Sequence, residues 1–266
     1  MDVTGKVFVV TGAGNGIGRE VTLQLLAGGG SVAGVDLNEA GLARTAELAG
    51  GVSAFSAHVV NITDRAAVEQ LPAAVIAAHG QVDAVVNVAG IIQKFVKVID
   101  LPYEEIEKVM NVNFWGVVTM CKTFLPLLTE RPAAALVNVA SMGAYAPVPG
   151  QAVYGASKAA VTLLTEALYA ELMGTSVAVT VIYPGAIGTD IATNSGVAIA
   201  GDATADASSF KMTSPVEAGR VIVDAIVKGR FRATIGSDAA MMDRLSRLNP
   251  KFATRLIAKQ MGGLLS

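Results

Sequence analysis

The chain has 266 residues, a formal charge of -2 and an isoelectric point near 5.7. Hydrophobic residues make up 52% of it and the mean hydropathy is +0.52, which indicates a substantial buried core and excludes a disordered protein. The small negative charge gives no broad basic field, so nucleic acid is not an expected partner. At this length the chain suits one large α/β domain or two small ones.

The sequence has few features of exported or metal-binding proteins. Cys121, the one cysteine, lies in an apolar run with helical spacing, so we expect a buried thiol and no internal disulfide. The amino terminus does not resemble a signal peptide, and no uncharged apolar stretch reaches about 18 residues. We therefore expect a cytoplasmic protein. His58 and His79 are isolated, so we expect both to be structural and predict no metal.

Short β-branched runs alternate with helical patterns along the chain. A run at 6–12 stops at a glycine, and helical spacing follows until the glycines at 28–30. Further strands are predicted at 31–36, 52–59, 82–90, 134–141, 177–185 and 232–236. Helices are predicted from about 38, from 63–64, across 103–129, over about 152–173 and from near 215. Apolar strands that each precede a helix indicate a parallel sheet with helices on both faces.

Residues 194–213 are small and polar, and they interrupt this alternation. Gly196 and Gly201 tolerate hinge motion, so we expect a lid that closes over substrate, with a passive surface loop as the alternative.

Residues 239–261 form an amphipathic segment, which predicts a catalytic domain over 1–238 and a helical extension over 239–266. Pro250 should break the segment into two helices. One face of a helical wheel collects Met241, Leu245, Leu248, Phe252 and Leu256, and a basic stripe beside it collects Arg244, Arg247, Lys251, Arg255 and Lys259. This pattern fits packing onto the core, a flap over the substrate mouth, a subunit contact or a surface that rests on anionic membrane.

A glycine-rich loop, "TGAGNGIG", lies between the first strand and the first helix. Gly12 allows a sharp turn, Gly16 a close approach to a pyrophosphate, and Gly18 close packing of helix on sheet. The position of the loop in a strand–turn–helix unit favours a dinucleotide site over glycines that merely end a strand.

Asp36 ends the second predicted strand, 18 residues beyond Gly18. A carboxylate there can accept hydrogen bonds from an adenosine ribose and would repel a 2′-phosphate. The alternative role, capping the next helix, can be filled by Asn38. Asn15 and Leu37 stand where a basic residue would favour a phosphate, so we predict NAD as the cofactor.

In "YGASK", Tyr154 and Lys158 are four residues apart and share one face of a helix. By itself the pair fits a surface contact. It also fits an ammonium that lowers the pKa of a phenol toward neutrality.

The order of the motifs resembles that of the short-chain dehydrogenase/reductase family across roughly residues 5–236. The motifs are "TGAGNGIG", "NVAG" at 87–90, "VNFWG" at 112–116, "NVAS" at 138–141, "YGASK" and "YPGAIGTD" at 183–190. The resemblance implies a Rossmann-type doubly wound sheet of about seven strands and a catalytic tetrad of Asn113, Ser141, Tyr154 and Lys158. In this tetrad Tyr154 transfers the substrate proton, Ser141 binds the substrate oxygen, Lys158 holds the nicotinamide ribose and Asn113 supports a proton path.

The resemblance also implies a set of cofactor-binding residues. They are Gly12, Asn15, Gly16, Ile17, Gly18, Asp36, Leu37, Asn61, Ile62, Asn87, Ala89, Gly90, Tyr154, Lys158, Pro184, Gly185, Ile187 and Thr189. Asn61 departs from the family, which usually has an acidic residue at this position beside adenine, so we expect a small effect on affinity.

The expected substrate side is mostly apolar and has no arginine to bind a carboxylate. It includes Phe95, Ser141, Met142, Tyr145 and Ile191. We therefore expect an NAD-dependent, homo-oligomeric enzyme that interconverts a bulky apolar secondary alcohol, steroid-like or lipid-derived, and its ketone. The alternatives are a non-catalytic nicotinamide-binding redox regulator and a reductase of polar or acyl-carrier-linked substrates.

Overall fold

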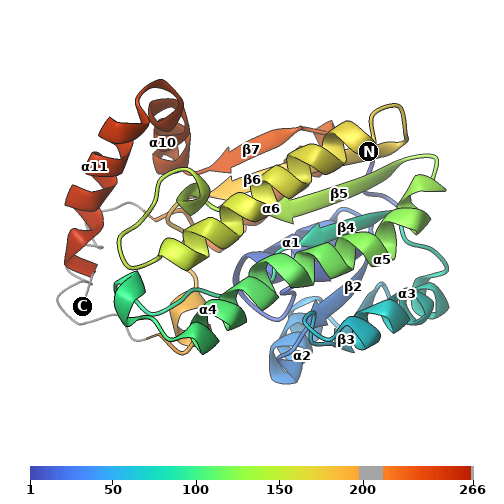
Figure 1. Ribbon diagram of the computed structural model, residues 1–266. Helices are drawn as coiled ribbons and strands as arrows, with labels where there is room; N and C mark the ends of the chain where they lie inside the picture. The colour runs from blue at the N-terminus through green and yellow to red at the C-terminus, as the bar shows by residue number, and fades with distance from the viewer. Residues whose placement is uncertain (198–211, 265–266) are drawn as a thin grey trace.

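The computed structural model describes residues 1–197 and 212–264. Its centre is a parallel sheet of seven strands in the order β3-β2-β1-β4-β5-β6-β7 (Figure 1). The strands are β1 (Val7–Thr11), β2 (Ser31–Asp36), β3 (Phe55–Val59), β4 (Ala84–Asn87), β5 (Ala134–Val139), β6 (Val177–Pro184) and β7 (Arg232–Ile235). After β3 the chain crosses to the other half of the sheet, where β4 pairs with β1, so the switch point lies between β1 and β4. This order confirms the predicted Rossmann-type doubly wound sheet, and it opens a crevice at the carboxyl ends of β1 and β4.

Helices cover both faces of the sheet. The larger ones are α1 (Gly16–Ala27), α2 (Glu39–Leu48), α3 (Arg65–His79), α4 (Tyr103–Met110), α5 (Val117–Thr129), α6 (Ala152–Glu171) and α9 (Pro215–Lys228). Helices α5 and α6 cross the front of the sheet in Figure 1, with α3 beside α5, whereas α1, α2 and α9 pack on the opposite face. The central strands are therefore buried on both sides, which explains their uninterrupted apolar sequences.

The predicted long helix at 103–129 is present, but it contains a π-helical turn at Asn111–Gly116. A Cβ atom on Gly116 would lie 2.7 Å from Cδ1 of Ile62, so a larger residue here would require the Ile62 side chain to move. The run from Tyr103 to Thr129 is long and apolar enough by composition to span a membrane. However, Met120, Phe124 and Leu128 are buried against the sheet, as in the core helix of a globular domain.

The carboxyl-terminal segment forms two helices, α10 (Ser237–Leu248) and α11 (Pro250–Met261), so the predicted break at Pro250 is present. Helix α10 begins two residues before the expected domain boundary. The two helices lie at one end of the molecule, on the left in Figure 1, on the side of the amino end of α6.

The single apolar face predicted for 239–261 is wrong. The buried side chains are Ala239, Met242, Ala253 and Ile257. Leu245 and Leu256 are only partly buried, whereas Met241, Leu248 and Phe252 are exposed. On both helices the buried positions lie to one side of the predicted face, so the side chains that pack with Met142, Tyr145 and Ala146 are not those that the helical wheel selected.

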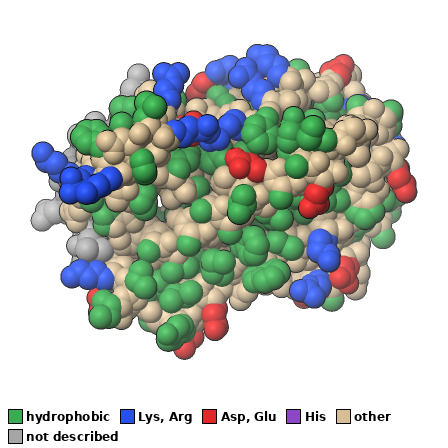
Figure 2. All heavy atoms as spheres, turned by 45° about the horizontal axis from the view of Figure 1, so that its top comes forward, with side chains coloured by type: hydrophobic (Ala, Val, Ile, Leu, Met, Phe, Trp, Pro, Cys, Tyr) green, Lys and Arg blue, Asp and Glu red, His purple; other side chains and the backbone are tan. Residues whose placement is uncertain are grey.

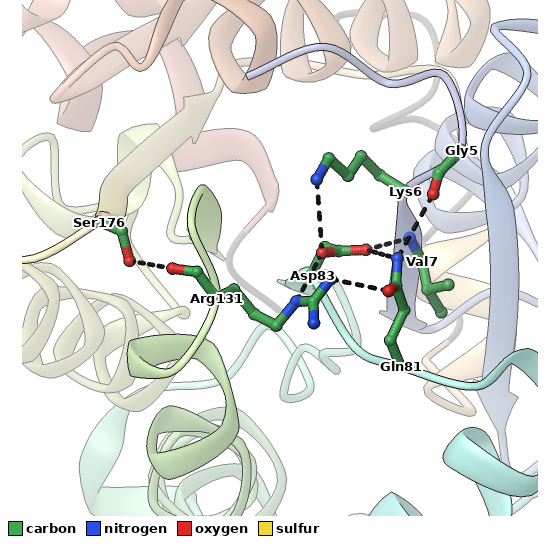
Figure 3. Close-up of polar contacts among 7 residues, drawn as sticks. All are labelled: Gly5, Lys6, Val7, Gln81, Asp83, Arg131 and Ser176. Atoms are coloured by element: carbon green, nitrogen blue, oxygen red, sulfur yellow. Dashed lines mark hydrogen bonds and ion pairs between the residues drawn. The ribbon is translucent and has the colours of Figure 1, made fainter.

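The amino ends of the strands are joined by a charged network around Asp83 (Figure 3). The Asp83 carboxylate is fully buried and accepts hydrogen bonds from Val7 N, Gln81 Nε2 and Arg131 Nε at 2.9, 2.7 and 2.9 Å. Lys6 lies 3.7 Å from the same carboxylate. These contacts satisfy the buried charge and fix the start of β1 to the segments that precede β4 and β5.

The expected lid at 194–213 falls mainly on residues 198–211, outside the described residues. Its described part begins at the last residue of the short helix α7 (Ile191–Asn194) and includes Ser195, whose Oγ accepts a hydrogen bond from Ile92 N at 3.0 Å.

Candidate active site at the carboxyl ends of the strands

A cavity of about 650 Å³ occupies the crevice between the two halves of the sheet. Many residues predicted for the cofactor line it: Gly12, Asn15, Gly16, Ile17, Gly18, Asp36, Leu37, Asn61, Ile62, Ala89, Gly90 and Thr189. The Thr11 hydroxyl accepts hydrogen bonds from Val88 N and Ala89 N at 3.1 and 3.2 Å, which holds the two walls together. The cavity therefore lies at the switch point of the sheet, where open α/β folds bind their ligands.

The glycine loop has the close contacts that a phosphate cradle requires. Gly12 has a φ of 72°, and a Cβ atom there would lie 3.0 Å from Ala89 N. A Cβ on Gly18 would lie 2.1 Å from Gly12 O, so no side chain can separate the loop from α1. Asn15 caps α1 by accepting from Gly16 N. The amino end of α1 therefore faces the cavity, where its dipole favours an anion.

Asp36 stands at the cavity edge with both carboxylate oxygens in use. Oδ2 accepts from Gly14 N and Oδ1 from Asn38 N, each at 2.9 Å. The cap of α2 is Asn38, whose side chain accepts from Gly41 N, so Asp36 is not needed for that role. Arg19, a cation close to this loop, bonds to Thr45 Oγ1 at 3.0 Å and to Gly14 O, and it is not among the cavity-lining residues.

Tyr154 and Lys158 lie on the first two turns of α6, and Ser141 lies just beyond β5. Lys158 is only 3% exposed, and its Nζ donates to Val139 O at 3.0 Å. Ser141 Oγ accepts from Gly143 N at 3.0 Å and also makes a hydrogen bond with the Tyr154 hydroxyl. Three residues predicted for one catalytic group are thus brought together.

The protonation of this pair differs from the expectation. Burial raises the pKa of Tyr154, and the hydrogen bond with Ser141 opposes this only in part. Burial also lowers the pKa of Lys158 to about 8. The Lys158 ammonium donates to the carbonyl of Val139, and the expected lowering of the Tyr154 pKa is not observed.

Asn113, the fourth predicted catalytic residue, is fully buried in the π-helical turn. Its side chain accepts from Ile91 N and donates to Ile91 O, both at 2.9 Å, and donates to Ser157 Oγ at 3.0 Å. Irregular turns of this kind are frequent at functional sites. Asn113 therefore connects the loop after β4 to α6.

Several predicted residues lie elsewhere. Asn87 is 2% exposed, and its amide donates to Asn138 Oδ1 at 2.8 Å in the core, because β4 alternates its side chains away from the cavity. Pro184 is buried at the end of β6, and Ile187 packs against the core beneath α9. The Tyr145 hydroxyl donates to Ala239 O at 2.9 Å, so this side chain anchors α10. Met142 packs beside Tyr145 against the carboxyl-terminal helices, Phe95 is half-buried, and Ile191 lines the cavity.

Asp238 contacts the site but was missed in the sequence. Its Oδ2 accepts from Ala186 N at 2.7 Å, and a Cβ on Gly185 would lie 2.3 Å from its oxygens. Thr213 holds the same turn from the other side through Ala186 O and Gly188 N. The one signal in the sequence is an acidic residue directly after the "IGS" turn that ends β7, a weak one because helices often begin with an acid.

Comparison with known proteins agrees with this geometry. The short chain dehydrogenase family model matches residues 6–199. SadH of Mycobacterium tuberculosis is 37% identical over 261 residues, which cover 96% of this chain and 94% of SadH. The 1-deoxy-11-beta-hydroxypentalenate dehydrogenase of Streptomyces avermitilis is 34% identical over 243 residues, which cover 90% of this chain and 87% of that protein.

Solved structures share the fold. A short chain dehydrogenase/reductase from Burkholderia phymatum, in complex with NAD, aligns with a TM-score of 0.83 at 25% identity, covering 94% of this chain and 98% of that one. A short chain dehydrogenase from Burkholderia cenocepacia, in complex with NADP, aligns with a TM-score of 0.81 at 23% identity, covering 97% and 99%. Motif order, sheet topology and these matches have one common explanation: the chain belongs to the short-chain dehydrogenase/reductase family of oxidoreductases.

Proposed function

We propose that this protein is an NAD(H)-dependent oxidoreductase that interconverts a secondary alcohol and a ketone. The observation that carries the proposal is the convergence of Ser141, Tyr154 and Lys158 beside the dinucleotide-type cavity. A Cβ atom on Gly90, which lines this cavity, would lie 3.0 Å from Lys158 Nζ, so the ammonium lies directly behind the cavity wall. A redox regulator without chemistry would need the cavity but not this arrangement.

The residues present fit a nicotinamide dinucleotide. The narrow glycine loop and the amino end of α1 suit a pyrophosphate, and Asp36 suits the hydroxyls of an adenosine ribose. Asn61, exposed at the cavity edge, would lie beside adenine, while Thr189 and Gly90 would flank the nicotinamide half. Charge supports NAD over NADP, because Asp36 would repel a 2′-phosphate and Arg19 is bonded elsewhere.

The chain's own residues would handle the proton. For alcohol oxidation, Ser141 Oγ holds the substrate oxygen while the Tyr154 phenolate takes its proton as general base. With the cofactor bound, Lys158 would donate to its ribose hydroxyls and would stabilise that phenolate by its charge, which opposes the effect of burial on the Tyr154 pKa. When bound, the oxidised nicotinamide would supply the acceptor, at its C4 position, for the hydride that leaves the alcohol carbon. Asn113 holds Ile91, which lines the cavity, and thereby fixes the loop after β4.

An apolar substrate fits the cavity best. Ile91, Val112 and Ile191 are among the residues that line it. Lys94, the cation that could bind a polar head group, is 60% exposed, lies 3.9 Å from Glu105 and is not among the cavity-lining residues. The relative from Streptomyces avermitilis is named for a hydroxypentalenate, which is consistent with a bulky, lipid-derived or steroid-like substrate.

We also propose a cytoplasmic homo-oligomer that contacts membranes peripherally through α10 and α11. Support for the location is the lone, buried Cys121 thiol. Support for self-association is the exposed apolar surface of Tyr103, Trp115 and Leu163 on α4, the π-helical turn and α6. Support for membrane contact is the basic and apolar surface of the carboxyl-terminal helices.

The function is tested by incubating the protein with NAD⁺ and a panel of bulky secondary alcohols while recording NADH absorbance. The control is Tyr154→Phe, which keeps the ring and removes only the proton-transferring oxygen. We expect the variant to bind NADH normally and to lose turnover by about 10²–10⁴-fold. Near-normal kcat in Tyr154→Phe would contradict the assigned acid/base. Lack of turnover with any alcohol or ketone, in a protein that binds NADH, would favour the regulator.

A further inference from the structure

Gln93 is a fully buried amide in the loop between β4 and α4, and it contacts the start of the helix that carries Tyr154. Its Oε1 accepts hydrogen bonds from Val153 N and Tyr154 N at 2.9 and 3.0 Å. Its Nε2 donates to Gly150 O at 3.0 Å. Two N–H donors at one end and a carbonyl at the other fix the orientation of this amide.

Helix α6 lacks the usual cap from its own sequence. The residue at the cap position, Gln151, makes no side-chain bond to the first turn of the helix. The first-turn N–H groups of a helix have no partner within the helix, so buried ones need an acceptor from elsewhere. Gln93 supplies this acceptor from 60 residues away in the chain. Gln151 in turn donates through Nε2 to Gln93 O at 2.6 Å, so the two segments hold each other.

The residues directly before Gln93 hold other parts of the site. Ile91 is bonded through both backbone groups to Asn113, and Ile92 N donates to Ser195 Oγ after α7. Residues 91–93 therefore connect the π-helical turn, the segment after β6 and the start of α6. Within this connection, Gln93 is the member that reaches the backbone of Tyr154 itself.

We propose that Gln93 is a positioning residue that caps α6 from outside and fixes the Tyr154 phenol relative to Ser141 and Lys158. The proposal rests on the proposed function for its catalytic consequence, whereas the cap itself does not depend on any activity. Tyr154 lies in the first turn of α6, where loss of the cap frays the helix first. Lys158 lies one turn further in and keeps its bond to Val139 O.

The test compares Gln93→Leu, which has a similar volume and no acceptor, with Gln93→Glu, which keeps an acceptor for the two N–H groups but cannot donate to Gly150. The matched control is Asp64→Ala. Asp64 caps α3 by accepting a hydrogen bond from Ala67 N at 3.1 Å, and the substitution removes this acceptor. Helix α3 contributes no residue to the tetrad. Three readouts are used: hydrogen exchange of the peptide that spans 150–160, ¹³Cζ-tyrosine NMR of the Tyr154 phenol, assigned with Tyr154→Phe, and kcat with NAD⁺ and cyclohexanol or the best alcohol of the panel.

In Gln93→Leu we expect faster exchange over 150–160 and a Tyr154 pKa that falls toward that of a free phenol as water enters. We also expect kcat to fall by about 10²-fold with an unchanged Kd for NADH, since a small displacement of the reacting group has effects of that size. Gln93→Glu should recover part of both losses. Asp64→Ala should change none of the three readouts beyond a general loss of thermal stability.

Unchanged exchange in Gln93→Leu would refute the cap. Faster exchange with an unchanged phenol titration would refute the positioning role, as would an unchanged kcat in an enzyme that turns over. If the wild-type protein oxidises no alcohol, the proposed function fails by itself, and exchange and NMR still decide on Gln93.

Discussion

The Lys158 ammonium combines near-complete burial with a charge that the proposed chemistry requires. Its hydrogen bond to Val139 O offsets part of the desolvation, and the pKa still falls to about 8 from 10.5. At a pKa of about 8 the side chain is still mostly charged at neutral pH, so the folded protein bears the cost of a buried ammonium. The stability of the cofactor-free protein should therefore be lower than its core alone would allow.

Lys158→Met tests this cost through the pH dependence of unfolding. Because the folded pKa lies below the unfolded one, stability decreases as pH falls from about 10.5 to about 8 and stays low below that range. We expect the variant to be more stable than the wild type by roughly 3 kcal/mol near pH 7, and this difference to shrink near pH 10. Urea unfolding at both pH values measures it. An equal difference at the two pH values would contradict the buried charge as its source.

Asp36→Asn tests cofactor choice. The substitution keeps an oxygen for Gly14 N and removes the negative charge, so we expect the preference for NADH over NADPH to fall by about tenfold, mainly through tighter NADPH binding. Dissociation constants from cofactor fluorescence measure it. The control is Asp190→Asn, a second acid of the cavity lining. Equal effects from both variants would assign the preference to general charge and not to Asp36.

At the scale of single elements, the turn between β6 and α7 is held from two sides, by Asp238 of α10 and by Thr213. The turn carries Thr189 into the cavity, so its position depends on the start of the carboxyl-terminal extension. The extension is therefore connected to the cofactor site even though its helices lie at the end of the molecule (Figure 1).

Asp238→Ala should weaken NADH binding by about tenfold, because Ala186 N loses its acceptor and the turn is no longer fixed. Asp238→Asn keeps an oxygen for Ala186 N and should bind NADH nearly as well as the wild type. Titration calorimetry measures both. If the alanine variant binds normally, the turn is held by Thr213 alone.

The sequence was sufficient where local patterns and the fold coincide. Strands such as β1 and β5 are apolar throughout, so their pattern predicted the sheet. The spacing of Tyr154 and Lys158 predicted that they share a helix face, whereas their role in a site came from the family resemblance. The sequence was insufficient where contacts join distant segments. The cap of α6 by Gln93, the contact of Asp238 with Ala186 and the choice of the buried face on α10 and α11 depend on tertiary structure, which no periodicity records.

At the scale of the whole molecule, basic side chains gather on the carboxyl-terminal helices although the formal net charge of the chain is only -2. Helices α10 and α11 carry five basic side chains against the acids Asp238 and Asp243, of which Asp243 is paired with Arg232 and Arg247. Leu248 and Phe252 are 85% and 53% exposed among these cations. Figure 2 shows Lys and Arg side chains gathered at the same end of the molecule. This surface suits an anionic lipid interface.

Charge reversal tests the membrane contact. The double variant Lys251→Glu/Arg255→Glu should reduce binding to phosphatidylserine-containing liposomes by about tenfold or more, since each basic residue near such a surface contributes roughly 1 kcal/mol. The control, Arg65→Glu/Lys122→Glu, makes the same change in net charge on exposed positions of α3 and α5. Sedimentation at low and high salt measures both. Equal losses in the two variants, or no binding by the wild type at low salt, would contradict a specific surface.

The Asp83 network has a consequence for the order in which the molecule can form during synthesis. Its members span from Lys6 to Arg131, and Ser176 fixes the Arg131 backbone through a further hydrogen bond (Figure 3). A nascent chain that has emerged only as far as β4 therefore holds a buried carboxylate without its arginine. Since an incompletely paired charge opposes burial, the first half of the sheet should stay open until β5 and the segment before β6 have left the ribosome. The two halves would then close together, and the cofactor crevice between them would appear late, as one of the last features of the fold.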